Sequence, residues 1–107
     1  MIALALVGSP SANLRITVWP DGRSAGGGRV WTLHCPSADP ACRKLAALAG
    51  NPFAPTPPGV ACTQIYGGPD EALVTGTFRG RKVWARFHQR DGCAIARWNR
   101  IAFLFAK

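Results

Sequence analysis

Four cysteines, Cys35, Cys42, Cys62 and Cys93, constrain this chain of 107 residues more than any other feature of its sequence. No Cys-x-x-Cys motif is present, and neither the close pair nor the distant pair has the short spacing of a structural zinc site. In so short a chain, four cysteines are typical of two disulfides in a protein of an oxidising compartment. We therefore expect two disulfides, no metal and secretion, while the cysteine positions alone leave the pairing open.

The composition predicts one folded domain over residues 1–107. Hydrophobic residues make up 48% of the chain and charged residues 17%, so a core can form despite 12 Gly and 9 Pro. The 13 Lys and Arg outnumber the five Asp and Glu, which gives a formal net charge of +8. Such a surplus attracts acidic partners but does not specify a fold.

Clusters of Gly and Pro divide the chain into short segments. Runs of β-branched and aromatic residues predict strands over 2–7, 14–19 and 29–34. The apolar run at 2–7 is far shorter than the roughly 20 residues that a membrane helix needs. We therefore expect no membrane segment.

The segment 39–50 has the end signals of a helix. Asp39 suits the N-cap, Pro40 the first helical position and Gly50 the C-terminal stop. An apolar stripe at helical spacing would face the core and carry Cys42 inward. The stripe consists of Cys42, Leu45, Ala46 and Ala49.

A hairpin is predicted where strands over 72–78 and 81–88 flank Arg79 and Gly80. Two-residue pairing places Phe78 opposite Arg81. One face would then join the core, with Val74, Phe78, Val83, Ala85 and Phe87, and the other would hold Thr75, Thr77, Trp84 and Arg86. A short helix after Cys93 and a closing strand over 101–105 complete an α+β domain with an antiparallel sheet of about five strands.

Enzyme chemistry finds little support in the sequence. The serines fall in loop-like stretches without a nucleophile elbow, and no local arrangement joins them to His34 or His88. His88 is best read as a solvated residue beside Arg86 and Arg90. We therefore expect neither an enzyme nor a cofactor.

A basic stretch near the C-terminus has the composition of a nucleic-acid site, because cations alternate with tryptophans. The favoured interpretation is that the tryptophans are half-buried and the arginines solvate a basic surface. Nucleic acid is thus not the expected partner, although a secreted polyanion-binding module remains the alternative function. The residues are Arg79, Arg81, Lys82, Arg86, Arg90, Arg97 and Arg100, with Trp84 and Trp98.

The stretch 55–69 is the remaining candidate. Prolines stiffen its first part, Cys62 ties it to the domain, and Gly67 to Pro69 end it. These properties suit a substrate-like loop that enters a protease cleft as an added strand. They suit an ordinary connecting loop with a disulfide equally well.

Over most of its length the chain resembles the Streptomyces subtilisin inhibitors and related secreted proteins of actinobacteria. The resemblance is carried by Leu33-His34-Cys35, Asp39-Pro40-Ala41-Cys42-Arg43-Lys44-Leu45, Cys62-Thr63-Gln64-Ile65-Tyr66 and Gly80-Arg81-Lys82-Val83, and by the order of the four cysteines. It implies a secreted inhibitor of serine proteases of the subtilisin class, with disulfides Cys35–Cys42 and Cys62–Cys93.

The resemblance also implies the reactive site. The scissile bond would join Gln64 to Ile65, and the protease-contact residues would be Val60, Ala61, Cys62, Thr63 and Tyr66. Homodimers formed through a sheet face are implied as well, although Arg15 interrupts the first long strand where that face would prefer an apolar residue. Exposed Gln64 has one further reading, as the acyl donor for a secreted transglutaminase.

Overall fold

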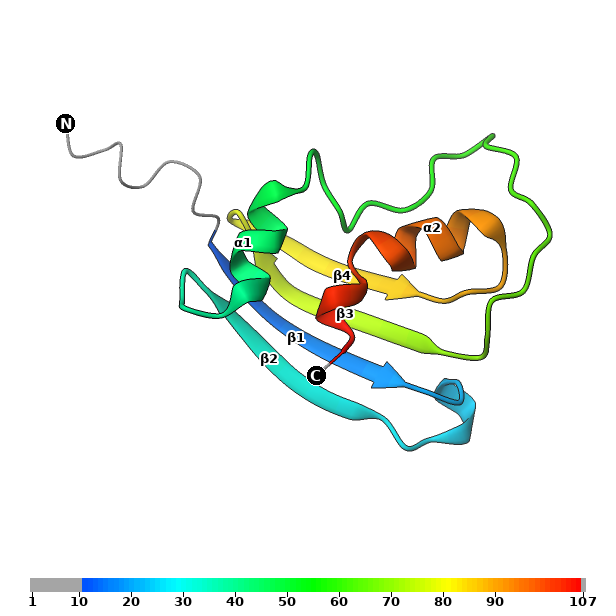
Figure 1. Ribbon diagram of the computed structural model, residues 1–107, viewed down its shortest axis with the longest axis horizontal. Helices are drawn as coiled ribbons and strands as arrows, with labels where there is room; N and C mark the ends of the chain where they lie inside the picture. The colour runs from blue at the N-terminus through cyan, green and yellow to red at the C-terminus, as the bar shows by residue number, and fades with distance from the viewer. Residues whose placement is uncertain (1–10, 107) are drawn as a thin grey trace.

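A computed structural model describes residues 11–106 and shows an α+β fold with one antiparallel sheet (Figure 1). The sheet order is β2–β1–β3–β4, and two helices and a C-terminal turn cover one face. We call the covered side the inner face and the other the outer face. The strands are β1 (Ala12–Trp19), β2 (Arg29–Cys35), β3 (Glu71–Phe78) and β4 (Arg81–Phe87). The helical elements are α1 (Pro40–Ala47), α2 (Gly92–Arg100) and the 3-10 turns η2 (Arg23–Ala25) and η3 (Ala102–Leu104).

The fold class is confirmed, with four strands in the described residues instead of about five. The strand expected over 2–7 lies outside the described residues. Both disulfides form with the pairing that the resemblance implied, Cys35–Cys42 and Cys62–Cys93. No helix within residues 11–106 is long and apolar enough to cross a membrane.

The β3–β4 hairpin has the predicted register. Phe78 pairs with Arg81, and the two turn residues both have positive φ, 52° at Arg79 and 80° at Gly80. This combination matches the twist of a two-residue hairpin, and glycine adopts it without steric cost. The predicted core residues of the hairpin are all buried: Val74, Phe78, Val83, Ala85 and Phe87.

Helix α1 begins as predicted but ends early. The Asp39 carboxylate accepts a hydrogen bond from the Ala41 N–H at 2.9 Å, and Cys42 and Leu45 face the core. The helix stops at Ala47, because Leu48 turns extended and packs against the core. Ala49 is therefore not part of the apolar stripe, and the prediction that Gly50 ends the helix is wrong.

The C-terminal region differs from the expected strand over 101–105. Ile101, Leu104 and Phe105 are buried at a helical spacing, and η3 forms in place of the strand. The Trp31 indole N–H donates to the Leu104 carbonyl at 3.1 Å, which fixes this turn against β2. The short helix expected after Cys93 is confirmed in kind, but it begins at Gly92, because the Asp91 carboxylate caps it through the Ala94 N–H at 2.8 Å.

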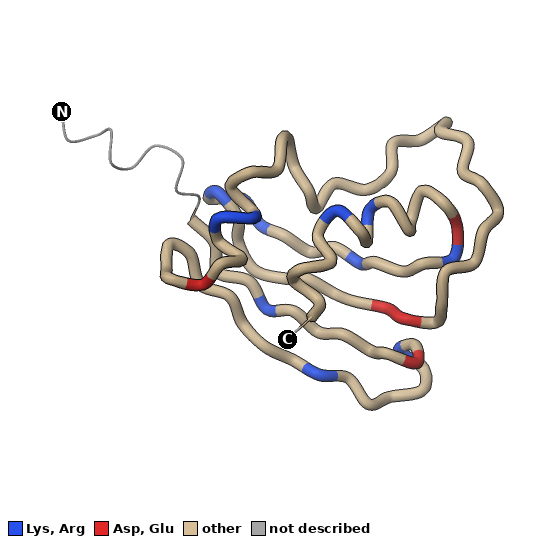
Figure 2. The backbone as a smooth tube through the Cα atoms, in the orientation of Figure 1, with Lys and Arg blue, Asp and Glu red and all other residues tan. Residues whose placement is uncertain are grey.

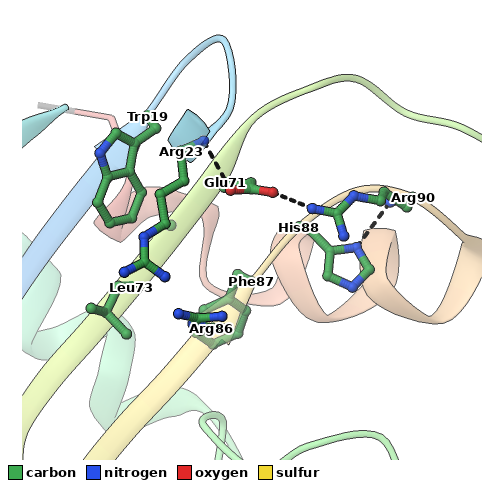
Figure 3. A pocket seen from close by; sticks show the side chains of 9 residues that line it. Trp19, Arg23, Glu71, Leu73, Arg86, Phe87, His88 and Arg90 are labelled. Atoms are coloured by element: carbon green, nitrogen blue, oxygen red, sulfur yellow. Dashed lines mark hydrogen bonds and ion pairs between the residues drawn. The ribbon is translucent and has the colours of Figure 1, made fainter. Parts of the chain in front are cut away.

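A carboxylate at one end of the outer face joins three elements (Figure 3). Glu71 accepts a hydrogen bond from the Arg23 main-chain N–H at 2.9 Å and forms an ion pair with Arg90. His88 lies beside them, and its Nδ1 accepts from the Arg90 N–H at 3.1 Å. The Arg23 hydrogen bond, followed by the charge of Arg90, lowers the pKa of Glu71.

A lowered folded-state pKa makes Glu71 a source of acid sensitivity. Its contribution is present above the unfolded-state pKa and is lost as the pH falls through the folded-state value. We expect Glu71→Gln to reduce the free energy of unfolding at pH 7 by at most about 1 kcal/mol, because the pair is partly exposed. Urea unfolding should show this difference shrinking below pH 4.5, the ordinary glutamate pKa. A difference that grows on acidification would contradict the assignment.

Candidate functional site

The stretch 55–69 forms an exposed arm that arches past α2 before the chain enters β3 (Figure 1). It contains no helix or strand. Three apolar side chains on it face solvent, Val60 at 50% exposure, Ile65 at 55% and Tyr66 at 67%. Ala61, Thr63 and Gln64 are also exposed, and Cys62 is half-buried. The residues predicted to contact a protease thus lie together on an accessible loop.

Three interactions hold this loop close to the start of α2. The Cys62–Cys93 disulfide joins the loop to the first turn of the helix. Next to it, the Gly92 N–H donates to the Thr63 carbonyl at 2.9 Å. Further along, the Gly67 N–H donates to the Gln89 carbonyl at 2.7 Å. Main-chain hydrogen bonds therefore flank the Gln64–Ile65 bond on both sides.

Gly92 lies against the Thr63 side chain of the loop. A methyl group added at Gly92 would overlap the Thr63 hydroxyl. The first N–H groups of α2 lack partners inside the helix, and the Gly92 N–H bonds to the Thr63 carbonyl instead. Gly92 is thus a positioning residue that sequence reasoning missed, although its place beside Cys93 was a usable signal.

The segment before the loop is held by arginines from the same helix. The Arg97 guanidinium donates to the carbonyls of Ala54 and Arg86, both at 3.0 Å, and lies 4.3 Å from the ring centroid of Phe87. Burial lowers the pKa of Arg97, as expected for a cation partly withdrawn from water. One turn later, Arg100 donates to the Ala49 carbonyl.

The cations and tryptophans that the sequence grouped as a possible nucleic-acid site have different roles in the structure. Arg97 and Arg100 bind main-chain carbonyls, and Trp98 is buried in the core at 8% exposure. Trp84 is 65% exposed, so the prediction of half-buried tryptophans is wrong for both residues. The sequence could not show that Trp98 is buried and Trp84 exposed. Burial depends on which face of the sheet packs against α2, and this is a tertiary contact.

One cluster has the composition of a metal site, since ligand atoms of Cys62, Asp91 and Cys93 lie within 4.8 Å of one another. The two sulfurs are joined in a disulfide and cannot act as thiolates. The Asp91 carboxylate caps α2. The cluster therefore serves to fix the loop to the helix.

The two histidines have separate surroundings. His34 on β2 makes a side-chain hydrogen bond to Asn13 at 2.5 Å, whereas His88 contacts the main chain of Arg90. Neither arrangement includes a serine.

Comparison of the chain with models of protein families, with curated proteins and with solved structures finds no match.

The contact between Gly92 and Thr63 can be tested by a double-mutant cycle. Gly92→Ala should lower the free energy of unfolding by about 1 kcal/mol, because the added methyl group overlaps the Thr63 hydroxyl and this side chain must turn away from its present rotamer. Thr63→Ala in the same chain should restore most of the loss.

Urea unfolding of the two single variants and the double variant gives the coupling free energy. Thr63→Ala alone should change stability by less than about 0.5 kcal/mol, because the side chain is exposed. Additive effects of the two substitutions would show that the Thr63 hydroxyl does not pack against Gly92.

Proposed function

We propose that this protein is a secreted, substrate-like inhibitor of serine proteases of the subtilisin class, related to the family that its sequence resembles. The observation that carries the proposal is the exposed Gln64–Ile65 bond between two main-chain hydrogen bonds and beside a disulfide. In this proposal, Gln64 enters the specificity pocket of the protease. Val60 to Thr63 and Tyr66 contact the cleft on either side.

Tight binding would follow from the order already present in the loop. A flexible peptide loses conformational entropy when it enters a protease cleft, whereas a fixed loop has lost that freedom during folding. The Thr63 carbonyl and the Gly67 N–H are both held by the folded body, at 2.9 and 2.7 Å from their partners. Little ordering is then left for the binding step.

Slow turnover would follow from the same contacts. Attack on the Gln64 carbonyl breaks the bond to Ile65 and leaves a new amine at Ile65. The acyl side stays attached through the Cys62–Cys93 disulfide, and the amine side through Gly67 and β3. The amine therefore remains near the acyl group at a high effective concentration, which favours reformation of the bond.

The side chain of Gln64 sets the expected target. It is polar, uncharged and unbranched at Cβ, which suits the roomy pocket of a subtilisin. A trypsin pocket carries a carboxylate at its base and would find no cation on this side chain. Subtilisin inhibition should therefore exceed trypsin inhibition.

Inhibition assays against subtilisin, trypsin, chymotrypsin and a metalloprotease test the proposal. Gln64→Lys should improve trypsin inhibition by at least about tenfold, because it supplies the missing cation. Gln64→Pro should abolish inhibition of both enzymes. Thr77→Lys, on the outer face, adds the same charge away from the loop and should change neither.

The site of attack can be read directly. After incubation with catalytic subtilisin at mildly acidic pH, the new N-terminus should be Ile65. A first cut elsewhere with inhibition intact would refute the assignment. Incorporation of an amine at Gln64 by a transglutaminase, without inhibition of any protease, would instead support the acyl-donor function.

A homodimer formed through the outer face is the second part of the proposal. Arg15 lies in the middle of that face, between Thr32 on β2 and Thr75 on β3. A two-fold interface would bring Arg15 close to its symmetry mate, and the repulsion would be screened by salt. Light scattering at micromolar concentration should show a dimer that strengthens as salt rises. Arg15→Val should strengthen it further, and a monomer mass for both proteins would exclude this interface.

A further inference from the structure

A groove of about 410 Å³ runs beside the hairpin end of β4, away from the reactive loop. Phe53, Phe78 and Val83 contribute its apolar lining. Gly50 and Asn51 form the opposite side. The strand β4 is the last in the order β2–β1–β3–β4 (Figure 1). Because Arg81 to Trp84 line the groove, it lies along this edge of the sheet.

The main chain of this edge has hydrogen-bonding groups without a strand partner. In a two-residue hairpin, Phe78 and Arg81 bond to each other, so alternate residues of β4 turn their N–H and C=O outward. These residues are Lys82, Trp84 and Arg86. The Arg86 carbonyl does face outward, since it accepts a hydrogen bond from Arg97. Arg97 therefore covers one end of the edge.

At its other end the edge faces Gly50 and Asn51 across the groove. Within residues 11–106, no neighbouring segment or side chain bonds to the outward groups of Lys82 and Trp84. An exposed edge with free N–H and C=O groups is a template for an added strand. The Trp84 ring is exposed beside it and offers apolar surface.

The charge around the groove is entirely positive. Arg79, Arg81 and Lys82 line it, and no carboxylate among the described residues does. Lys and Arg outnumber Asp and Glu over the whole described backbone (Figure 2). Lysine and arginine on an edge strand also discourage aggregation, so cations alone do not indicate a ligand. Here they surround a groove that Phe53, Phe78 and Val83 line in part, beside main-chain groups that have no strand partner. A surface that only solvates the edge of the sheet requires neither feature.

We propose that an acidic peptide segment in extended conformation binds here as an added strand on β4. Its main chain bonds to Lys82 and Trp84, its carboxylates lie on the outer face beside Lys82, and the apolar side chains on its other face enter the groove over Phe53 and Val83. A single-stranded nucleic acid fits less well, because it lacks an alternating row of N–H and C=O groups. The proposal is independent of the reactive loop.

The test uses the intact, isotopically labelled protein and an acetylated octapeptide that alternates Glu with Val. Titration should shift the amide signals of Lys82 and Trp84 and slow their hydrogen exchange. The Val83 amide faces β3 and should change little. An octapeptide that alternates Lys with Val should bind at least about tenfold more weakly, because its charge is reversed.

Three comparisons make the result decisive. Methylation of alternate peptide nitrogens should abolish binding, since an added strand needs those N–H groups. Arg81→Gln with Lys82→Gln should weaken binding at least about tenfold, whereas Arg29→Gln with Arg43→Gln, an equal loss of charge outside the groove, should not. Gln64→Pro should leave peptide binding intact.

The proposal is overturned if the acidic peptide does not bind, or if the methylated peptide binds equally well. It is also overturned if an oligothymidylate binds more tightly than the acidic peptide at the same salt concentration. That result would support the polyanion-binding alternative.

Discussion

The attachment of the 49–67 segment to α2 is the constraint on which the loop geometry depends. The segment runs antiparallel to the helix, so its first residues contact the end of α2 and its later residues contact the start. Arg100 binds Ala49 and Arg97 binds Ala54. Cys93 is bonded to Cys62, and Gly92 binds Thr63. A long segment without helix or strand thereby gains a partner for its main chain. Because Trp98 buries the same helix against the core, these contacts tie the loop to the body of the domain.

Much of the fold could be predicted because the deciding interactions are local. Asp39 and Pro40 act within one helical turn, and Arg79 with Gly80 determine the hairpin register, so both elements begin or pair as expected. The end of α1 could not be predicted in the same way. Gly50 has positive φ, as a C-terminal stop would, yet Leu48 leaves the helix first because it packs against the core.

The prolines and Cys62 were enough to locate the candidate loop in the sequence. The residues that hold the loop in place could not be predicted. Gln89 and Arg97 are distant in sequence from the residues they hold, and nothing in their spacing indicates a contact. For Gly92 the one signal was its place beside Cys93. From the sequence, Arg97 was expected to be a solvated cation. In the structure its guanidinium binds main-chain carbonyls. The pairing of cysteines came from the resemblance, since the spacing left it open, and it is the same in the structure.

The supports of the loop consist of main-chain atoms at Thr63 and Gly67, with Gln64, Ile65 and Tyr66 exposed between them. A main-chain hydrogen bond is indifferent to the side chain of the residue next to it. Substitution at these three positions therefore leaves the packing of the domain unchanged. Selection can therefore alter the outward-facing side chains at three consecutive codons while the scaffold stays constant.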